Sequence, residues 1–154
     1  MFQQTIDSPL GDMQIFANEQ GLLRVTLGKI VATPDASSAL TRLAAEQLEQ
    51  YFYGDLTTFN LPLAATGTPF QQQVWQALCQ LPYGTTCSYA SIADSIAKPK
   101  AVRAVGAANG RNPLAIVVPC HRVIGANGSL TGYAGGLRNK AWLLQHEQRL
   151  KLQH

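Results

Sequence analysis

The chain has 154 residues, of which 46% are hydrophobic and 14% charged, which suits one compact unit or two small domains sharing a core. The net charge of +3 permits attraction to polyanions but does not identify one. Three cysteines cannot all pair, and no hydrophobic signal segment opens the chain, so we expect free thiols and a cytoplasmic protein. No stretch approaches the about 20 apolar residues of a membrane span. We therefore expect no membrane span. No Cys or His pair has zinc-ligand spacing, so we expect no metal either.

The first part of the chain predicts a small sheet with a covering helix. Three short β-prone runs, at residues 2–6, 13–17 and 22–27, are separated by turn-forming residues and predict an antiparallel meander. Residues 39–53 then carry apolar side chains at helical spacing, and Gly54 is a suitable C-cap. A loop at residues 61–67 contains proline and glycine, so we place a domain boundary there, giving domains 1–66 and 67–154.

The second part is predicted to be mostly helical, which makes the fold class α+β. Thr68 is an expected N-cap, Pro69 occupies the first helical position and Gln71 completes a capping box. The inward stripe of this helix is Phe70, Val74, Leu78 and Leu81. Two further helices, from Ser88 to about residue 96 and over about residues 101–109, are joined by a tight turn. They form either a helix-turn-helix or a plain αα-hairpin.

The second of these two helices has an unusual outward face. Val102, Val105 and Gly106 are expected to face inward, which leaves Arg103, Ala104 and Ala107 outside. A helix that reads bases in the major groove usually presents several polar side chains. Small side chains instead allow close approach to a narrow groove, where one Arg can reach into the base stack. An Ala-rich helix packed against another helix explains the periodicity equally well.

Cys120 has neighbours that favour reactivity. The apolar run at residues 114–118 is predicted to be a buried extended segment leading to Pro119 and Cys120. A lone buried cysteine is normally inert packing. His121 and Arg122 follow it directly, and a nearby base or cation stabilises the nucleophilic thiolate. Cys79, in a helix, and Cys87, in a loop, lack such neighbours and are interpreted as structural.

A last helix, over residues 137–150, places an acid near the packed face. Glu147 falls three and four residues after Leu144 and Leu143, so its carboxylate is expected at the border of that face. There it could orient His121 in a Glu-His-Cys relay. The simpler alternative is an ion pair with Lys140 or Lys151.

These motifs together resemble the methylated-DNA protein-cysteine methyltransferases, also called O6-alkylguanine-DNA alkyltransferases. The matching motifs are Asn112-Pro113, residues 119–123, residues 132–136 and Trp142-Leu143-Leu144-x-x-Glu147, in order across about residues 68–147. The resemblance implies a ribonuclease-H-like sheet in residues 1–66. It also implies that residues 67–154 bind DNA and accept the alkyl group, through a winged-helix-like helix-turn-helix that enters the minor groove of double-stranded DNA.

The resemblance also implies roles for individual residues. Arg103 corresponds to a finger that fills the space of an extruded nucleotide, and Tyr89 to a tyrosine that crowds the target phosphate and contacts the base. Asn112 corresponds to the asparagine that joins the recognition helix to the active-site segment. The DNA-binding set implied in this way is Arg103, Tyr89, Ala104, Ala107 and Asn109.

The implied chemistry is direct-reversal DNA repair. Glu147 orients His121, which deprotonates Cys120 through a bridging water, and the thiolate then takes the methyl or larger alkyl group from O6-alkylguanine, and from O4-alkylthymine. The thioether product is stable, so each molecule acts once. The implied substrate pocket consists of Val123, Tyr133, Ala134 and Gly135. Ala134 stands where some members carry serine, which removes one hydroxyl donor to the base.

The same resemblance implies a stand-alone bacterial type without cofactor or metal. We expect a monomer in solution, and the sequence leaves cooperative assembly on DNA open. Three alternatives compete with this function. An alkyltransferase-like damage sensor would lack the reactive cysteine, which is present here as Cys120. A transcription regulator would need a richer base-reading face and a dimerisation segment. A Cys-His hydrolase would leave the DNA-binding elements unexplained.

Overall fold

The computed structural model describes residues 1–28, 30–32, 34 and 36–151, and the chain folds into two compact units. The first unit is Met1–Thr66 together with Pro113–Val117. The second consists of Gly67–Asn112 and the chain from Val118 onward. The short Pro113–Val117 segment therefore joins the first unit, although the division expected from the sequence placed it in the second.

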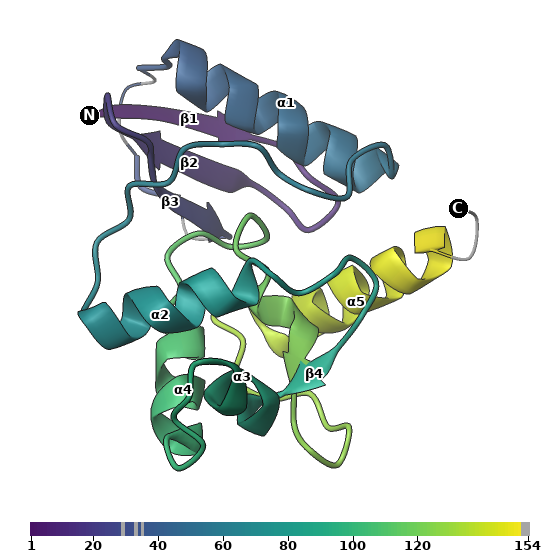
Figure 1. The fold of residues 1–154 in the computed structure, drawn as a ribbon. Helices are drawn as coiled ribbons and strands as arrows, with labels where there is room; N and C mark the ends of the chain where they lie inside the picture. The colour runs from purple at the N-terminus through teal and green to yellow at the C-terminus, as the bar shows by residue number, and fades with distance from the viewer. Residues whose placement is uncertain (29, 33, 35, 152–154) are drawn as a thin grey trace. The chain divides into compact units, whose positions relative to one another are not determined.

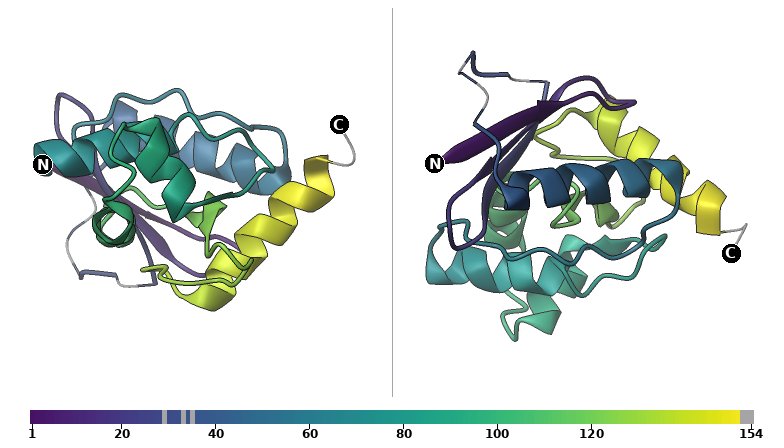
Figure 2. Two further views of the ribbon diagram at one scale, coloured as in Figure 1. Left: turned by 60° about the horizontal axis from the view of Figure 1, so that its bottom comes forward. Right: turned by 90° about the horizontal axis from the view of Figure 1, so that it is seen from above.

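The first unit is the predicted three-stranded meander with its helix. Strands β1 (Phe2–Ile6), β2 (Met13–Ala17) and β3 (Leu22–Leu27) form an antiparallel sheet in the order β1-β2-β3. Helix α1 (Ala39–Tyr53) lies across one face of the strands (Figures 1 and 2). It buries Thr41, Ala44, Leu48 and Tyr51. It ends at Gly54, whose φ of 90° is the left-handed conformation of a C-cap, as predicted.

The Pro113–Val117 segment pairs alongside β3 through an isolated parallel bridge between Val25 and Leu114. The Val25 amide donates to the Pro113 carbonyl at 2.9 Å, and the Ala115 amide donates to the Val25 carbonyl at 3.2 Å. The prediction of a buried extended segment at residues 114–118 is wrong at Ile116, which has a φ of 71° and starts a turn. A left-handed backbone is strained for a β-branched residue. Burial of the Ile116 side chain offsets that strain.

The second unit begins with helix α2 (Pro69–Leu78), whose start follows the prediction. The Thr68 hydroxyl accepts from the Gln71 amide at 3.1 Å, and the Gln71 side chain accepts from the Thr68 amide at 3.0 Å. Leu81 lies beyond the end of the helix. The predicted stripe omitted Trp75, which is buried and donates its indole N–H to the Ala108 carbonyl at 2.9 Å.

Helices α3 (Tyr89–Ser95) and α4 (Val102–Gly110) form the helix-turn-helix, and α2 packs against both (Figure 1). In the turn between them Ala97 has a φ of 60°, and the Lys98 amide donates to the Ala93 carbonyl at 2.9 Å. Strand β4 (Cys87–Ser88) pairs in parallel with β5 (Val123–Ile124). Cys87 thus lies in a short strand, not in the predicted loop.

The chain between β5 and helix α5 (Leu137–Lys151) is a long loop. Within the described residues, the longest helices have 15 residues, and none is long and apolar enough to cross a membrane.

The capping box at Thr68 provides a test of the second unit's stability. Thr68→Ala should lower the free energy of unfolding by about 1 kcal/mol, because the Gln71 amide loses the hydroxyl that accepts its hydrogen bond. Thr68→Ser keeps the hydroxyl and should stay close to the wild type. Denaturant unfolding followed by circular dichroism measures both variants. Equal stability of the alanine and serine variants would contradict a stabilising role for the cap.

Candidate active site

Cys120 is the first residue of a short 3₁₀-helix, η1 (Cys120–Arg122). Cys120 is only 6% exposed. Burial raises the pKa of the Cys120 thiol, while a hydrogen bond from the Asn112 side chain and the charge of Lys140 act in the opposite direction. Burial is the largest effect, so the thiol is protonated at neutral pH. A base is therefore needed to produce the thiolate.

Glu147 supplies the charge beside this segment. The sequence predicted it at the border of the packed face, but it is 1% exposed and fully inside. One carboxylate oxygen lies 2.7 Å from His121 Nε2. The other accepts from Arg122 Nε at 2.9 Å and from the Gly84 amide at 3.1 Å. The predicted relay pair of Glu147 and His121 is therefore present, and the cation that pairs with the carboxylate is Arg122 rather than a lysine.

These contacts fix the protonation of His121. Burial alone raises the pKa of Glu147, but hydrogen bonds from His121 and Arg122 hold that pKa well below its ordinary range. Burial lowers the pKa of His121. A neutral imidazole facing a carboxylate must donate its Nε2 proton, so Nδ1 carries the lone pair. Among the described residues Nδ1 has no hydrogen-bond partner, which leaves it available as a base.

Arg122 is the main residue whose role the sequence did not reveal. Its guanidinium binds both Glu147 oxygens, through Nε at 2.9 Å and Nη2 at 3.0 Å, and donates from Nη1 to the Leu81 carbonyl at 2.8 Å. It also lies over the Tyr83 ring, 5.6 Å from the centroid. A bidentate pair of this kind sets both the position and the charge of the carboxylate. The position of Arg122 next to His121 was the only sequence signal for its importance, and that signal did not identify Glu147 as its partner.

Lys140 is a second such residue. It is fully buried, and its ammonium donates to the Val123 carbonyl at 2.6 Å and to the Thr131 carbonyl at 2.7 Å. Burial lowers its pKa, and the neighbouring Cys120 raises it. Lys140 therefore ties the end of the cysteine segment to the following loop and places a positive charge near the thiol.

Two asparagines connect α4 to the same segment. Asn112 donates from Nδ2 to the Val118 carbonyl at 2.8 Å, so it joins the end of α4 to the residues before Cys120. Asn109 was expected among the DNA-facing residues, but it is 2% exposed, and its Nδ2 makes a long hydrogen bond of 3.5 Å to the Cys120 carbonyl. The structure thus places Asn109 at the inner face of the helix, not on the surface.

The remaining predicted pocket residues differ in exposure. Tyr133 is buried, its hydroxyl has no partner among the described residues, and burial and the nearby Cys120 raise its pKa. Ala134 is exposed, and the Gly135 carbonyl accepts from the Asn139 side chain at 2.9 Å. The Val123 amide already donates to the Cys120 carbonyl. A base held by Val123 would have to compete with that bond.

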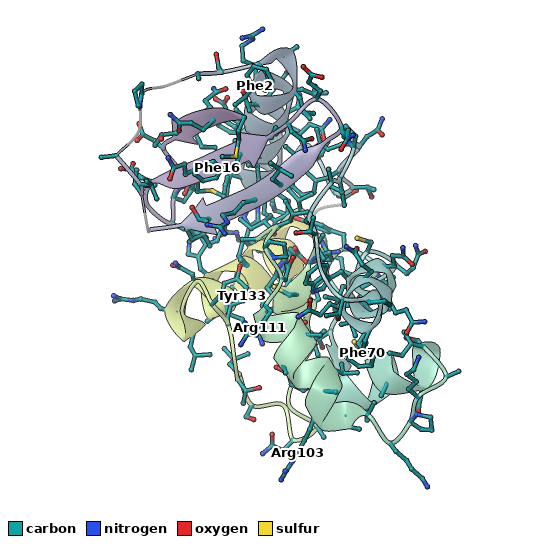
Figure 3. The ribbon with its side chains drawn as sticks, turned by 90° about the vertical axis from the view of Figure 1, so that its left-hand side faces the viewer. Phe2, Phe16, Phe70, Arg103, Arg111 and Tyr133 are labelled. Carbon is teal, nitrogen blue, oxygen red and sulfur yellow. The ribbon has the colours of Figure 1, made fainter. Side chains whose placement is uncertain are left out.

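The outer face of α4 agrees with the predicted pattern at three positions. Arg103, Ala104 and Ala107 are exposed, and Figure 3 shows Arg103 projecting away from the helices of this unit. Val102 was expected to face inward with Val105, but it is 37% exposed. The outer face therefore consists of one cation among small and aliphatic side chains.

A helix-turn-helix thus shares one compact unit with a buried cysteine, beside which stands a His–Glu pair. Known family models match both parts of the chain. The "6-O-methylguanine DNA methyltransferase, DNA binding domain" matches residues 69–149, and the "6-O-methylguanine DNA methyltransferase, ribonuclease-like domain" matches residues 1–65. The chain belongs to the 6-O-methylguanine DNA methyltransferase family.

Similar proteins cover nearly the whole chain. A methylated-DNA–protein-cysteine methyltransferase of Methanosarcina barkeri is 50% identical, covering 96% of this chain and 98% of its own. The constitutive methylated-DNA–protein-cysteine methyltransferase of Bacillus subtilis is 46% identical, with coverages of 96% and 95%. The crystal structure of Mycobacterium tuberculosis OGT in complex with DNA superposes with a TM-score of 0.90 at 45% identity, covering 97% and 94% of the two chains.

The Glu147 network provides a second test. Glu147→Gln should lower the free energy of unfolding by about 3 to 5 kcal/mol at neutral pH, because the buried Arg122 charge loses its counter-ion. The folded pKa of Glu147 is depressed, so its contribution is present above the unfolded pKa of about 4.5 and is lost as pH falls through the folded value. The difference between wild type and variant should therefore shrink below about pH 4.5.

Thermal and denaturant unfolding across pH 3 to 8 measure this effect. Glu46→Gln, at an exposed position of α1, is the matched control and should show little change at any pH. A constant difference between Glu147→Gln and the wild type down to pH 3 would contradict the assigned ionisation.

Proposed function

We propose that this chain repairs DNA by direct reversal, moving the alkyl group of O6-alkylguanine onto Cys120. The observation that carries the proposal is the buried thiol next to the His121–Glu147 pair, in the unit that also holds the helix-turn-helix. Relatives named methylated-DNA–protein-cysteine methyltransferases cover almost the entire chain, and a similar structure was solved with DNA.

The charge distribution supports binding of DNA through the second unit. That unit carries nine Lys and Arg residues against two acids, whereas the first carries three against seven. Arg122 and Lys140 are buried and held by internal contacts. The others are exposed: Lys98, Lys100, Arg103, Arg111, Arg138, Arg149 and Lys151. Phosphate contacts from these cations should make binding weaken as salt rises.

Helix α4 is proposed to lie in the minor groove of double-stranded DNA. Its outer face offers Ala104 and Ala107, whose methyl groups permit close approach of the helix. Arg103 is the one long side chain on this face, and in the proposal it takes the place of the flipped nucleotide. The half-buried Tyr89 begins the neighbouring helix, from which it would crowd the target phosphate and contact the base.

The chemical step is a displacement at the alkyl carbon. The Cys120 sulfur forms a bond to that carbon, and the bond from the carbon to O6 of guanine breaks. The thiol proton passes through a water to His121 Nδ1, which the Nε2–Glu147 bond holds in the accepting form. The Tyr89 hydroxyl protonates the departing guanine and then regains a proton from the His121 imidazolium through solvent, so the net reaction moves one proton from thiol to base. The thioether is stable, and each molecule reacts once.

The pocket residues in this scheme are Val123, Tyr133, Ala134 and Gly135. The hydroxyl of Tyr133 is buried near Cys120 and can donate to the base. Ala134 has no hydroxyl, so the backbone of this turn carries the remaining recognition. Because the pocket reads a small planar base with an alkylated oxygen, O4-alkylthymine is a second proposed substrate.

The two parts of the chain are proposed to differ in role. Residues 67–154 bind DNA and accept the alkyl group, and residues 1–66 form a ribonuclease-H-like sheet domain. We place the protein in the cytoplasm, where a reducing environment keeps Cys120 a free thiol.

Incubation with duplex DNA containing O6-methylguanine tests the reaction directly. Intact-mass measurement should show a single methyl adduct, which peptide mapping should place on Cys120. Cys120→Ser should remain unmodified, whereas Cys79→Ser, which changes an exposed thiol, should react like the wild type. Excess substrate should produce no second turnover. An unmodified wild-type protein would overturn the proposed transfer.

Arg103→Ala tests the flipping role. The variant should lose more than about tenfold in rate on duplex DNA, since the extruded nucleotide is no longer replaced, and should react normally with free O6-benzylguanine. Arg149→Ala removes another exposed cation, in α5, and is the matched control for the change in charge. Equal losses on duplex and free base, or equal losses in both variants, would contradict the role of Arg103.

A further inference from the structure

Thr131 holds the hydroxyl of Tyr89. The phenolic oxygen lies 3.1 Å from Thr131 Oγ1 and 3.3 Å from the Thr131 carbonyl oxygen. The carbonyl can only accept, whereas the threonine hydroxyl can accept or donate, so the pair can satisfy the phenol in either direction. Tyr89 starts α3, and Thr131 lies in the loop after β5. The contact therefore connects the helix-turn-helix to the loop that leads to the pocket residues.

The backbone of Thr131 is itself fixed. Its carbonyl accepts from the buried ammonium of Lys140 at 2.7 Å, and the same ammonium binds the Val123 carbonyl at 2.6 Å. Charge-assisted hydrogen bonds of this length restrict the peptide strongly. Gly132 follows with a φ of 51°, and a Cβ at that position would lie 3.8 Å from the Tyr89 hydroxyl. The loop thus passes directly beside the phenol on an anchored backbone.

The side chain of Thr131 is exposed, and Tyr89 is only half-buried. A half-buried tyrosine is restrained less by packing than a buried one, so a hydrogen bond to its hydroxyl contributes to fixing its rotamer. Replacing Thr131 by valine keeps the branched shape and removes only the hydroxyl. The position therefore allows the side-chain hydrogen bond to Tyr89 to be removed without disturbing buried groups, while the contact with the Thr131 carbonyl stays.

We propose that Thr131 is a positioning residue for Tyr89 in the alkyl-transfer reaction. This rests on the proposed function, in which the Tyr89 hydroxyl meets the target nucleotide. In this proposal Thr131 acts through Tyr89 and not on the substrate itself. It holds the phenol in one orientation before DNA binds, so the Tyr89 side chain does not have to change rotamer when the target nucleotide binds. The anchor of this arrangement is Lys140, which also stands near Cys120.

A double-mutant cycle with Tyr89→Phe tests the proposal. The measured quantity is the second-order rate constant of Cys120 methylation by duplex DNA containing O6-methylguanine, followed by intact mass. Thr131→Val should lower it about threefold to tenfold, the effect of one hydrogen bond. Thr131→Ser should restore it. In the Tyr89→Phe background, Thr131→Val should have no further effect, because the partner hydroxyl is already gone.

The matched control is Ser129→Ala, which removes a hydroxyl from the same loop and should react like the wild type. Thermal unfolding of all variants should agree within about 2 °C, since no buried group changes. A Thr131→Val rate equal to that of the wild type would overturn the proposal. So would an equal loss with and without the Tyr89 hydroxyl. Absence of any adduct on the wild type would instead overturn the proposed function, so the two failures are distinguishable.

Discussion

The structure of the second unit depends on the buried carboxylate of Glu147. A charge at a fully enclosed position is tolerated only when ion pairs and hydrogen bonds surround it. Here they come from η1, through His121 and Arg122, and from the Gly84 amide before β4. The next residue of α5, Gln148, also donates to the Gly84 carbonyl at 2.6 Å. The carboxylate that joins these three segments also fixes the tautomer of His121, so both the fold of this unit and the proposed chemistry depend on one group.

The environment of Cys120 is suited to a reagent that reacts once. Burial keeps the thiol protonated and largely out of reach of solvent, which protects it from oxidants and from alkylating agents in solution. The Asn112 side chain and the Lys140 charge favour the thiolate but do not outweigh burial. In the proposed reaction the thiolate is therefore generated when a base removes the proton. Since the proposed reaction does not regenerate the modified protein, a low resting reactivity preserves its single use.

Local features could be predicted from the sequence, and long-range polar contacts could not. The strands of the meander, the cap at Gly54 and the capping box at Thr68 depend on residues close in the chain. The guanidinium of Arg122 and the ammonium of Lys140 find partners 25 and 17 residues away, which periodicity does not encode. Glu147 was expected at a border because its partners were unknown, and an unpaired acid would not be buried. Likewise, the run of apolar residues does not predict the left-handed backbone conformation of Ile116.

Helix α4 shows why the sequence alone did not decide which of its residues are buried and which are exposed. Asn109 lies six residues after Arg103 in α4. That spacing alone does not tell whether the Asn109 side chain faces solvent or the rest of the unit, because the answer depends on where the neighbouring elements lie. The structure puts Arg103 outside, while Asn109 and the following Asn112 reach the Cys120 segment. At about 1.5 Å per residue, the six steps from Arg103 to Asn109 span about 9 Å along a rigid helix. The distance from the proposed groove contact to the contact between Asn109 and the Cys120 backbone is thus set by a helix rather than by a loop, and sites built on such elements are held most accurately.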